Sequence, residues 1–212
     1  MKKIIILSVL FFMMTSTRGQ ITGLWEVTKV DVGQETMTPV ARWFQLNEDK
    51  SMQSGNGGIH HSRGTYVITP DNSVLIFTDE YGKTDPYGAF RVTLTSDKMI
   101  WERMEDGQPV TVNLVKAADF PKGPWDKAIG NWKLVESTEH EKVADMGIFL
   151  RWDREYRAQN GLMGDDDSGI WQIAAHHPQL RLVSFNGDLP HLEYTVSFFR
   201  DYRMIWTNED ES

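Results

Sequence analysis

The sequence of 212 residues contains one pattern twice, and this repeat limits the possible folds more than any other feature. Gly23-Leu24-Trp25 opens the first copy and Gly130-Asn131-Trp132 opens the second. Five further matches follow in the same order along both copies, so we interpret the chain as an internal duplication of one structural unit. The matches pair Trp43-Phe44 with Phe149-Leu150, residues 52–57 with 158–164, 63–68 with 168–173, 90–94 with 194–198, and 98–103 with 203–208.

Within each copy, β-branched and aromatic residues alternate with polar ones, and clusters of Gly, Pro, Asn and Asp separate the runs. No stretch has the 3.6-residue period of an amphipathic helix. Short strands at this spacing predict an all-β fold, either a sandwich or an up-and-down barrel. We expect strands near residues 23–32, 40–47, 51–55, 63–69, 73–79, 88–95, 98–104 and 109–116, and near 131–138, 147–153, 156–160, 169–174, 179–185, 191–199 and 202–208.

The N-terminal residues are typical of a secretory signal. Lys2 and Lys3 precede an apolar run that is shorter than the ~20 residues of a membrane span. The alternative is an N-terminal membrane anchor that stays attached. We predict an exported, soluble protein, periplasmic or secreted, without a membrane span after signal cleavage. The expected divisions are a signal peptide at 1–19, a first barrel at 20–117, a linker at 118–127 and a second barrel at 128–212.

The composition excludes some classes of protein. The chain contains no Cys, so an exported form is stabilised by its core and not by disulfides. A hydrophobic content of 40% and eight Trp indicate a packed globular protein rather than a disordered one. The formal net charge of −8 makes nucleic acid and anionic membranes unfavourable partners.

The two Gly-x-Trp openings suggest a plug for a small barrel. A Trp early in the first strand is large enough to fill one end, and the preceding Gly lets the entering chain turn sharply. Gly23-Leu24-Trp25 and Gly130-Asn131-Trp132, each before a run of β-hairpins, resemble the openings of the calycin superfamily, in particular the short lipocalin-like domains of exported bacterial proteins.

This resemblance implies two tandem antiparallel up-and-down β-barrels, in which Gly23, Trp25, Gly130 and Trp132 close the floors. It also implies that an Arg from a late strand stacks over the Trp. Arg103 is the candidate in the first copy, whereas Asn208 occupies the matching place in the second. The Thr-Asp-Tyr motif of the larger lipocalins is missing from both copies.

Aromatic residues recur at inward-facing positions of both copies. Such rings either pack the two cores or form the walls of a pocket for an apolar ligand. As ligand-binding candidates we take Trp43, Tyr66, Phe90 and Trp101 in the first copy, and Trp152, Trp171, Tyr194 and Trp206 in the second. Residues 55–62 and 82–88 are expected to form the rim of the first pocket.

Sequence patterns for metal binding and catalysis are absent. His60-His61 and His176-His177 are adjacent pairs, and neighbouring strand residues face opposite ways, so we predict no metal site. The Asp run within residues 164–169 does not alternate as a calcium loop requires, and a solvated hairpin tip is the preferred interpretation. We assign no catalytic residue and no cofactor, because the sequence has neither a nucleophile elbow nor a phosphate-binding glycine loop.

These observations favour an exported protein that holds a small apolar or amphipathic molecule in the mouth of a β-barrel. The alternative is a structural or protein-interaction module with solid barrels and no ligand cavity. A third hypothesis, an enzyme acting on a bound hydrophobic substrate, requires a buried His or carboxylate in a cavity. The sequence does not identify a protein partner.

Overall fold

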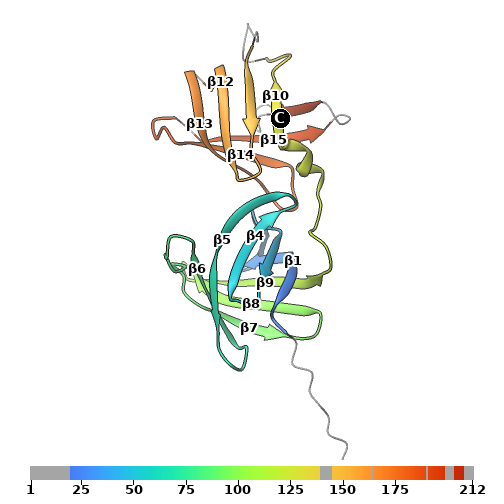
Figure 1. The fold of residues 1–212 in the computed structure, drawn as a ribbon, viewed down its shortest axis with the longest axis vertical. Helices are drawn as coiled ribbons and strands as arrows, with labels where there is room; N and C mark the ends of the chain where they lie inside the picture. The colour runs from blue at the N-terminus through green and yellow to red at the C-terminus, as the bar shows by residue number, and fades with distance from the viewer. Residues whose placement is uncertain (1–19, 139–144, 164, 190, 199–202, 208–212) are drawn as a thin grey trace, which may run out of the picture.

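The computed structural model describes residues 20–138, 145–163, 165–189, 191–198 and 203–207, and it shows two β units in tandem (Figure 1). The predicted signal peptide, residues 1–19, lies outside the described residues. A short 3-10 turn, η1 (Pro124–Ala128), lies between the units. The described part of the chain contains no helix with the length and apolarity of a membrane span.

The first unit is a closed antiparallel barrel of eight strands with one short additional strand, β2, at its side. Neighbours along the chain pair in the order β1-β3-β4-β5-β6-β7-β8-β9, and β9 returns to pair with β1. Because β9 pairs with both β1 and β8, the barrel has no free edge. The strands are β1 (Gly23–Val32), β2 (Glu35–Met37), β3 (Trp43–Leu46), β4 (Ser51–Asn56), β5 (Ile59–Ile68), β6 (Val74–Asp79), β7 (Phe90–Leu94), β8 (Lys98–Glu105) and β9 (Gln108–Ala117).

The second unit is a curled antiparallel sheet of seven strands, paired in chain order. Among the residues that the structure describes, no pairing joins its first and last strands, so this unit is an open half-barrel. Its strands are β10 (Gly130–Lys133), β11 (Gly147–Leu150), β12 (Glu155–Met163), β13 (Asp165–Ile173), β14 (Gln179–Ser184), β15 (Leu192–Phe198) and β16 (Met204–Thr207).

The strand registers confirm that the two units repeat one pattern. Gly23 is paired with Leu46, and Gly130 is paired with Leu150 at the corresponding place. Residue pairs that the sequence matches predicted occupy the same positions in both sheets. They are Tyr66 and Trp171 on β5 and β13, Phe90 and Tyr194 on β7 and β15, and Trp101 and Trp206 on β8 and β16.

Two neighbouring sequence matches were wrong by two positions. The register places Leu46 and Leu150 at the same position, so the counterpart of Phe44 is Ile148 and not Leu150. Leu46 pairs with Met52 and Leu150 with Tyr156, so Met52 corresponds to Tyr156 and not to Ala158. A shift of two residues keeps the same side of a strand facing the core, which is why the apolar pattern alone did not detect it.

The two floors have the same geometry. Trp25 is fully buried, and its indole Nε1–H donates to the Ile21 carbonyl at 2.7 Å. Trp132 makes the same bond to the Ala128 carbonyl, also at 2.7 Å. The preceding glycines have φ values of +128° and +147°, a backbone conformation that glycine adopts without strain.

A hairpin of the first unit joins the two units. The tip of the β4–β5 hairpin extends beyond its own barrel to the second unit (Figure 1), and Ile59, fully buried, belongs to the core of that unit. Asn56 Nδ2 donates to the carbonyls of Ile173 at 3.1 Å and Ala174 at 3.2 Å. The His60 backbone N–H donates to the Trp152 carbonyl at 3.0 Å. The hairpin therefore ties the barrel to the half-barrel.

Candidate functional site: a cavity in the first barrel

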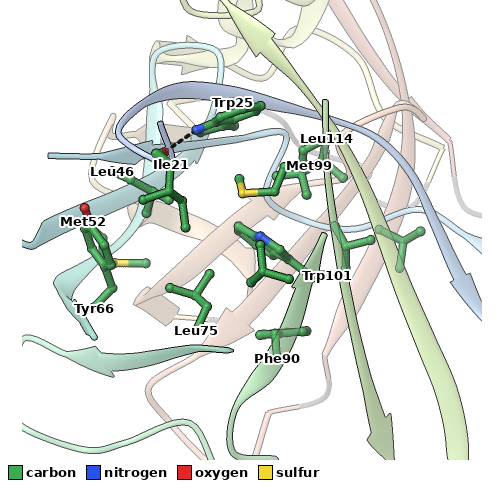
Figure 2. Close-up of a cluster of buried hydrophobic side chains, with 14 of the residues drawn as sticks. Ile21, Trp25, Leu46, Met52, Tyr66, Leu75, Phe90, Met99, Trp101 and Leu114 are labelled. Carbon is green, nitrogen blue, oxygen red and sulfur yellow. Dashed lines mark hydrogen bonds between the residues drawn. The ribbon is translucent and has the colours of Figure 1, made fainter. Parts of the chain in front are cut away.

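The first barrel contains a cavity of about 590 Å³. It lies in the part of the barrel away from Trp25. Figure 2 shows Trp25 at one end of the buried cluster, Phe90 at the other, and Met99 and Trp101 between them. The cavity walls are largely apolar and include Val30, Phe44, Phe77, Phe90, Trp101 and Val112.

The side chains change in size along the barrel, and this change leaves room for the cavity. Near the floor, large residues such as Trp25, Met99 and Leu114 fill the interior. Further along the same strands the inward positions carry valines, among them Val30 and Val110. β-branched side chains suit a strand but are too short to meet across the barrel.

Four aromatic rings form one continuous wall. Trp101 lies at the centre, with its ring centroid 4.9 Å from Phe44, 5.3 Å from Phe77 and 5.5 Å from Phe90. The contacts with Phe44 and Phe77 are edge-to-face, an arrangement that the aromatic quadrupole favours. The rings thus present a preformed apolar surface to the cavity.

Arg103 lies at the mouth of the cavity, and its side chain is only 9% exposed. The guanidinium binds Asp85 at 2.9 Å and Glu105 at 2.5 Å. It also donates to the Gly88 carbonyl at 3.1 Å and lies 3.8 Å from the centre of the Phe90 ring. These contacts fix the charged group against the aromatic wall.

The prediction that Arg103 stacks over Trp25 was wrong. Arg103 is level with Val110 and Val32, whereas Trp25 is level with Lys116. At about 3.3 Å per residue, Val32 lies roughly 20 Å along β1 from Trp25, which is too far for a contact. The cation over Trp25 is Lys116, with its Nζ 5.5 Å from the ring centre.

The loop after β6 forms much of the rim, as the sequence predicted for residues 82–88. Lys83, Asp85 and Tyr87 line the cavity. Asp79 holds this loop, because its Oδ1 accepts the backbone N–H groups of Tyr81 at 3.0 Å and Lys83 at 2.8 Å. The other predicted rim segment, residues 55–62, reaches the cavity through Ser62, while its tip packs into the second unit.

Of the four ligand-binding candidates in the first copy, Phe90 and Trp101 line the cavity. Trp43 is buried elsewhere, with its Nε1–H bonded to the Gly57 carbonyl at 2.9 Å and its ring 4.7 Å from Phe120. Tyr66 lies towards the floor, where its hydroxyl donates to the Asn47 carbonyl at 2.7 Å.

The four candidates of the second copy do not reach this cavity. Trp171 is buried and donates to the Arg151 carbonyl at 2.7 Å, in the position that Tyr66 occupies in the first unit. Tyr194 and Trp206 contact each other with ring centres 5.2 Å apart. Trp152 is 55% exposed and packs on the joint between the units.

Sequence reasoning missed Phe44, Phe77 and the role of Arg103 at the mouth. Phe77 could have been found, because it shares the inward face of β6 with the buried Leu75. Phe44 lies next to Trp43, whose larger ring was expected to face inwards.

The joint between the units contains His60 and His61. The His60 ring lies between Trp43 and Trp152, with centroid distances of 5.5 and 5.6 Å. Both ring nitrogens of His61 are buried without a hydrogen-bond partner. Burial lowers the pKa of His61 to about 3, and the positive charge of Arg154 and then His60 contribute.

Within the described residues, no group of three or more His, Cys, Asp and Glu is arranged to hold a metal ion. A scan of protein-family models finds no match to this sequence, and a search of curated proteins finds none.

Proposed function

We propose that this protein binds a small apolar or amphipathic molecule in the cavity of the first barrel. The observation that carries the proposal is an apolar, aromatic-walled space of about 590 Å³ with a few polar groups at its mouth. Ligand pockets in proteins typically measure about 300–1,000 Å³ and have this distribution of apolar walls and polar rim.

Transfer of apolar surface from water would drive binding, at about 25 cal/mol per Å². The wall is already assembled by contacts among Phe44, Phe77 and Trp101, so little ordering is needed when a ligand enters. The alternative, a solid module without a cavity, has less support because the first barrel is not filled.

We also propose that the chain is a lipocalin-like protein that is exported. The support is an eight-stranded antiparallel barrel with a Gly-x-Trp opening, repeated as a half-barrel with the same floor. Export rests on the basic and apolar character of residues 1–19.

Titration with the neutral fluorophore N-phenyl-1-naphthylamine tests the proposed function. We expect saturable fluorescence enhancement at one probe per chain. Val30→Phe places a ring in the cavity and should weaken binding at least tenfold. Val67→Phe, at a position that is 65% exposed, is the matched control and should leave binding unchanged. Non-saturable enhancement, or equal binding by a folded Val30→Phe protein, would contradict the proposal.

A further inference from the structure

The charges at the cavity mouth suggest which ligands the barrel accepts. We propose that the cavity selects amphipathic molecules with a cationic or neutral polar end and discriminates against anionic ones such as fatty acids. This inference rests on the proposed function and names the ligand class for the same site.

Arg103, the cation that would ordinarily attract an anionic head group, already has its partners. Asp85 and Glu105 both bind its guanidinium, and Gly88 accepts a further N–H. One face of the guanidinium is covered by the Phe90 ring. An incoming carboxylate would have to displace a carboxylate that the chain itself supplies, so Arg103 offers little net attraction to an anion.

The other charged residues at the mouth also disfavour an anionic ligand. Arg63 and Lys83 line the cavity together with Asp79, and Arg63 is bound to Glu80 at 2.7 Å. Tyr87 directs its hydroxyl to Asp106 at 2.9 Å, which brings a further carboxylate to the rim. The charged residues that line the cavity are three cations, Arg63, Lys83 and Arg103, and three carboxylates, Asp79, Asp85 and Glu105. Glu80 and Asp106 do not line it but bind the lining residues Arg63 and Tyr87.

With these two partners included, carboxylates outnumber cations around the mouth by five to three. The whole chain is also acidic, with a formal net charge of −8. A positive head group is attracted to such an entrance, and a negative one is repelled, more strongly where the apolar wall excludes water. A neutral hydroxyl can donate to a rim carboxylate without repulsion. The apolar tail is accommodated equally in all three cases.

Three probes with the same tail separate the contributions of head group and cavity: dodecylamine, dodecanol and dodecanoate. Each is titrated at pH 7 below its aggregation concentration, as a competitor of bound N-phenyl-1-naphthylamine. We expect dodecylamine and dodecanol to compete, and dodecanoate to be at least fivefold weaker than dodecanol. The difference should shrink as salt is raised, because salt screens exposed charges.

The outcomes distinguish the two proposals. If dodecanoate binds as tightly as dodecanol or more tightly, the selectivity inference is wrong and the binding function stands. If the fluorophore itself shows no saturable binding, the proposed function fails, and the inference fails with it.

A pair of variants tests the role of the Arg103 partners. Asp85→Asn with Glu105→Gln frees the guanidinium and removes two negative charges, so dodecanoate should become at least as strong a competitor as dodecanol. Glu193→Gln removes a carboxylate from Arg181 on the second unit and should leave the order of the three probes unchanged. If the double variant does not fold, as judged by circular dichroism, Glu105→Gln alone should narrow the gap; an unchanged gap in a folded variant would overturn the inference.

Discussion

The closed barrel and the open half-barrel are built from one repeated pattern, yet they differ in how completely they bury it. Trp25, Met99 and Trp101 are fully or almost fully buried. Their counterparts Trp132, Met204 and Trp206 are only partly buried. The difference is β9, which brings Val110, Val112 and Leu114 into the first core and pairs with both edges of the sheet. Closure thus depends on one additional strand and not on the repeated motif itself.

The half-barrel obtains part of its core from the other unit. Ile59 of the β4–β5 hairpin packs with residues of the second core, including Tyr156 and Trp171. The core of the barrel is therefore formed by the barrel alone, whereas the core of the half-barrel includes a side chain from the barrel. The following four predictions test this comparison.

Removal of the floor indole should have the largest effect and should differ between the units. Trp25→Ala should lower the free energy of unfolding by about 3–5 kcal/mol, because the ring is fully buried and leaves a cavity. Trp132→Ala should cost less, because that ring is partly exposed. Urea unfolding followed by circular dichroism measures both. Equal losses would show that the two floors are energetically equivalent and would contradict the comparison.

Truncation of the hairpin tip should destabilise the half-barrel more than the barrel. Ile59→Ala removes a fully buried side chain from the second core, so we expect a loss of about 2–5 kcal/mol. Native-state hydrogen exchange should show the loss of protection mainly in β12 and β13. Val67→Ala, on the exposed face of the same strand, should change stability by less than about 0.5 kcal/mol. Uniform loss of protection over both units would argue against a one-sided dependence.

Acid should weaken the joint between the units. The folded pKa of His61 is about 3, far below its ordinary value of 6.5, because the ring is buried near Arg154 and His60. The unfolded chain therefore binds the proton first as pH falls. The stabilisation is fully present above pH 6.5 and is lost as the pH drops from 6.5 towards 3. Between pH 7 and 5 this residue should account for up to about 2 kcal/mol of lost stability.

Urea unfolding at pH 7 and pH 5 measures the acid effect. His61→Leu should reduce the difference between the two values, because the buried group no longer titrates. His191→Leu, which replaces an exposed His, is the matched control and should keep the wild-type difference. The same acid sensitivity in His61→Leu would assign the effect to other groups.

Loss of the cation above the first floor should have the smallest effect. Lys116→Met removes the ammonium that lies over the Trp25 ring, and we expect a loss of about 0.5–1 kcal/mol. Lys133→Met on the second unit removes an exposed ion pair with Asp145 and should have a smaller effect. A larger loss for Lys133→Met would reverse this part of the comparison.

Much of the fold could be predicted from the sequence because alternation of apolar and polar residues records which face of a strand is buried. Most predicted strands correspond to observed ones, and β5, β12 and β13 each extend four residues beyond the predicted range. The Asp run at 164–169 was predicted to be a solvated hairpin tip. Asp165 does pair with Met163 at the end of the β12–β13 hairpin, but the run continues from there as part of strand β13. Asp167 is held there by the hydroxyls of Tyr156 at 2.6 Å and Ser184 at 2.7 Å, which alternation does not reveal.

Less of the site could be predicted. Alternation indicates on which side of a strand a residue lies, but not its position along the barrel axis. Phe90 and Trp101 were identified as wall residues, and both line the cavity. Tyr66 also points inwards but lies near the floor, where it packs instead of lining the space. Arg103 was assigned to the floor, whereas the registers of β8, β9 and β1 place it at the mouth.

The sequence by itself determined the duplication, the all-β class, nearly all of the strands and the two floor indoles. These features depend on local residue patterns or on their repetition along the chain, so the sequence is enough to predict them. Only the tertiary structure decided that the first unit closes and the second stays open over its described residues, that the β4–β5 hairpin enters the second core, and that Arg103 faces a cavity. The physical reason is that these three features depend on contacts and hydrogen-bond register between segments far apart in the chain. Local side-chain patterns do not specify the closure of a barrel, the entry of a hairpin into another core, or the position of a residue along the barrel axis.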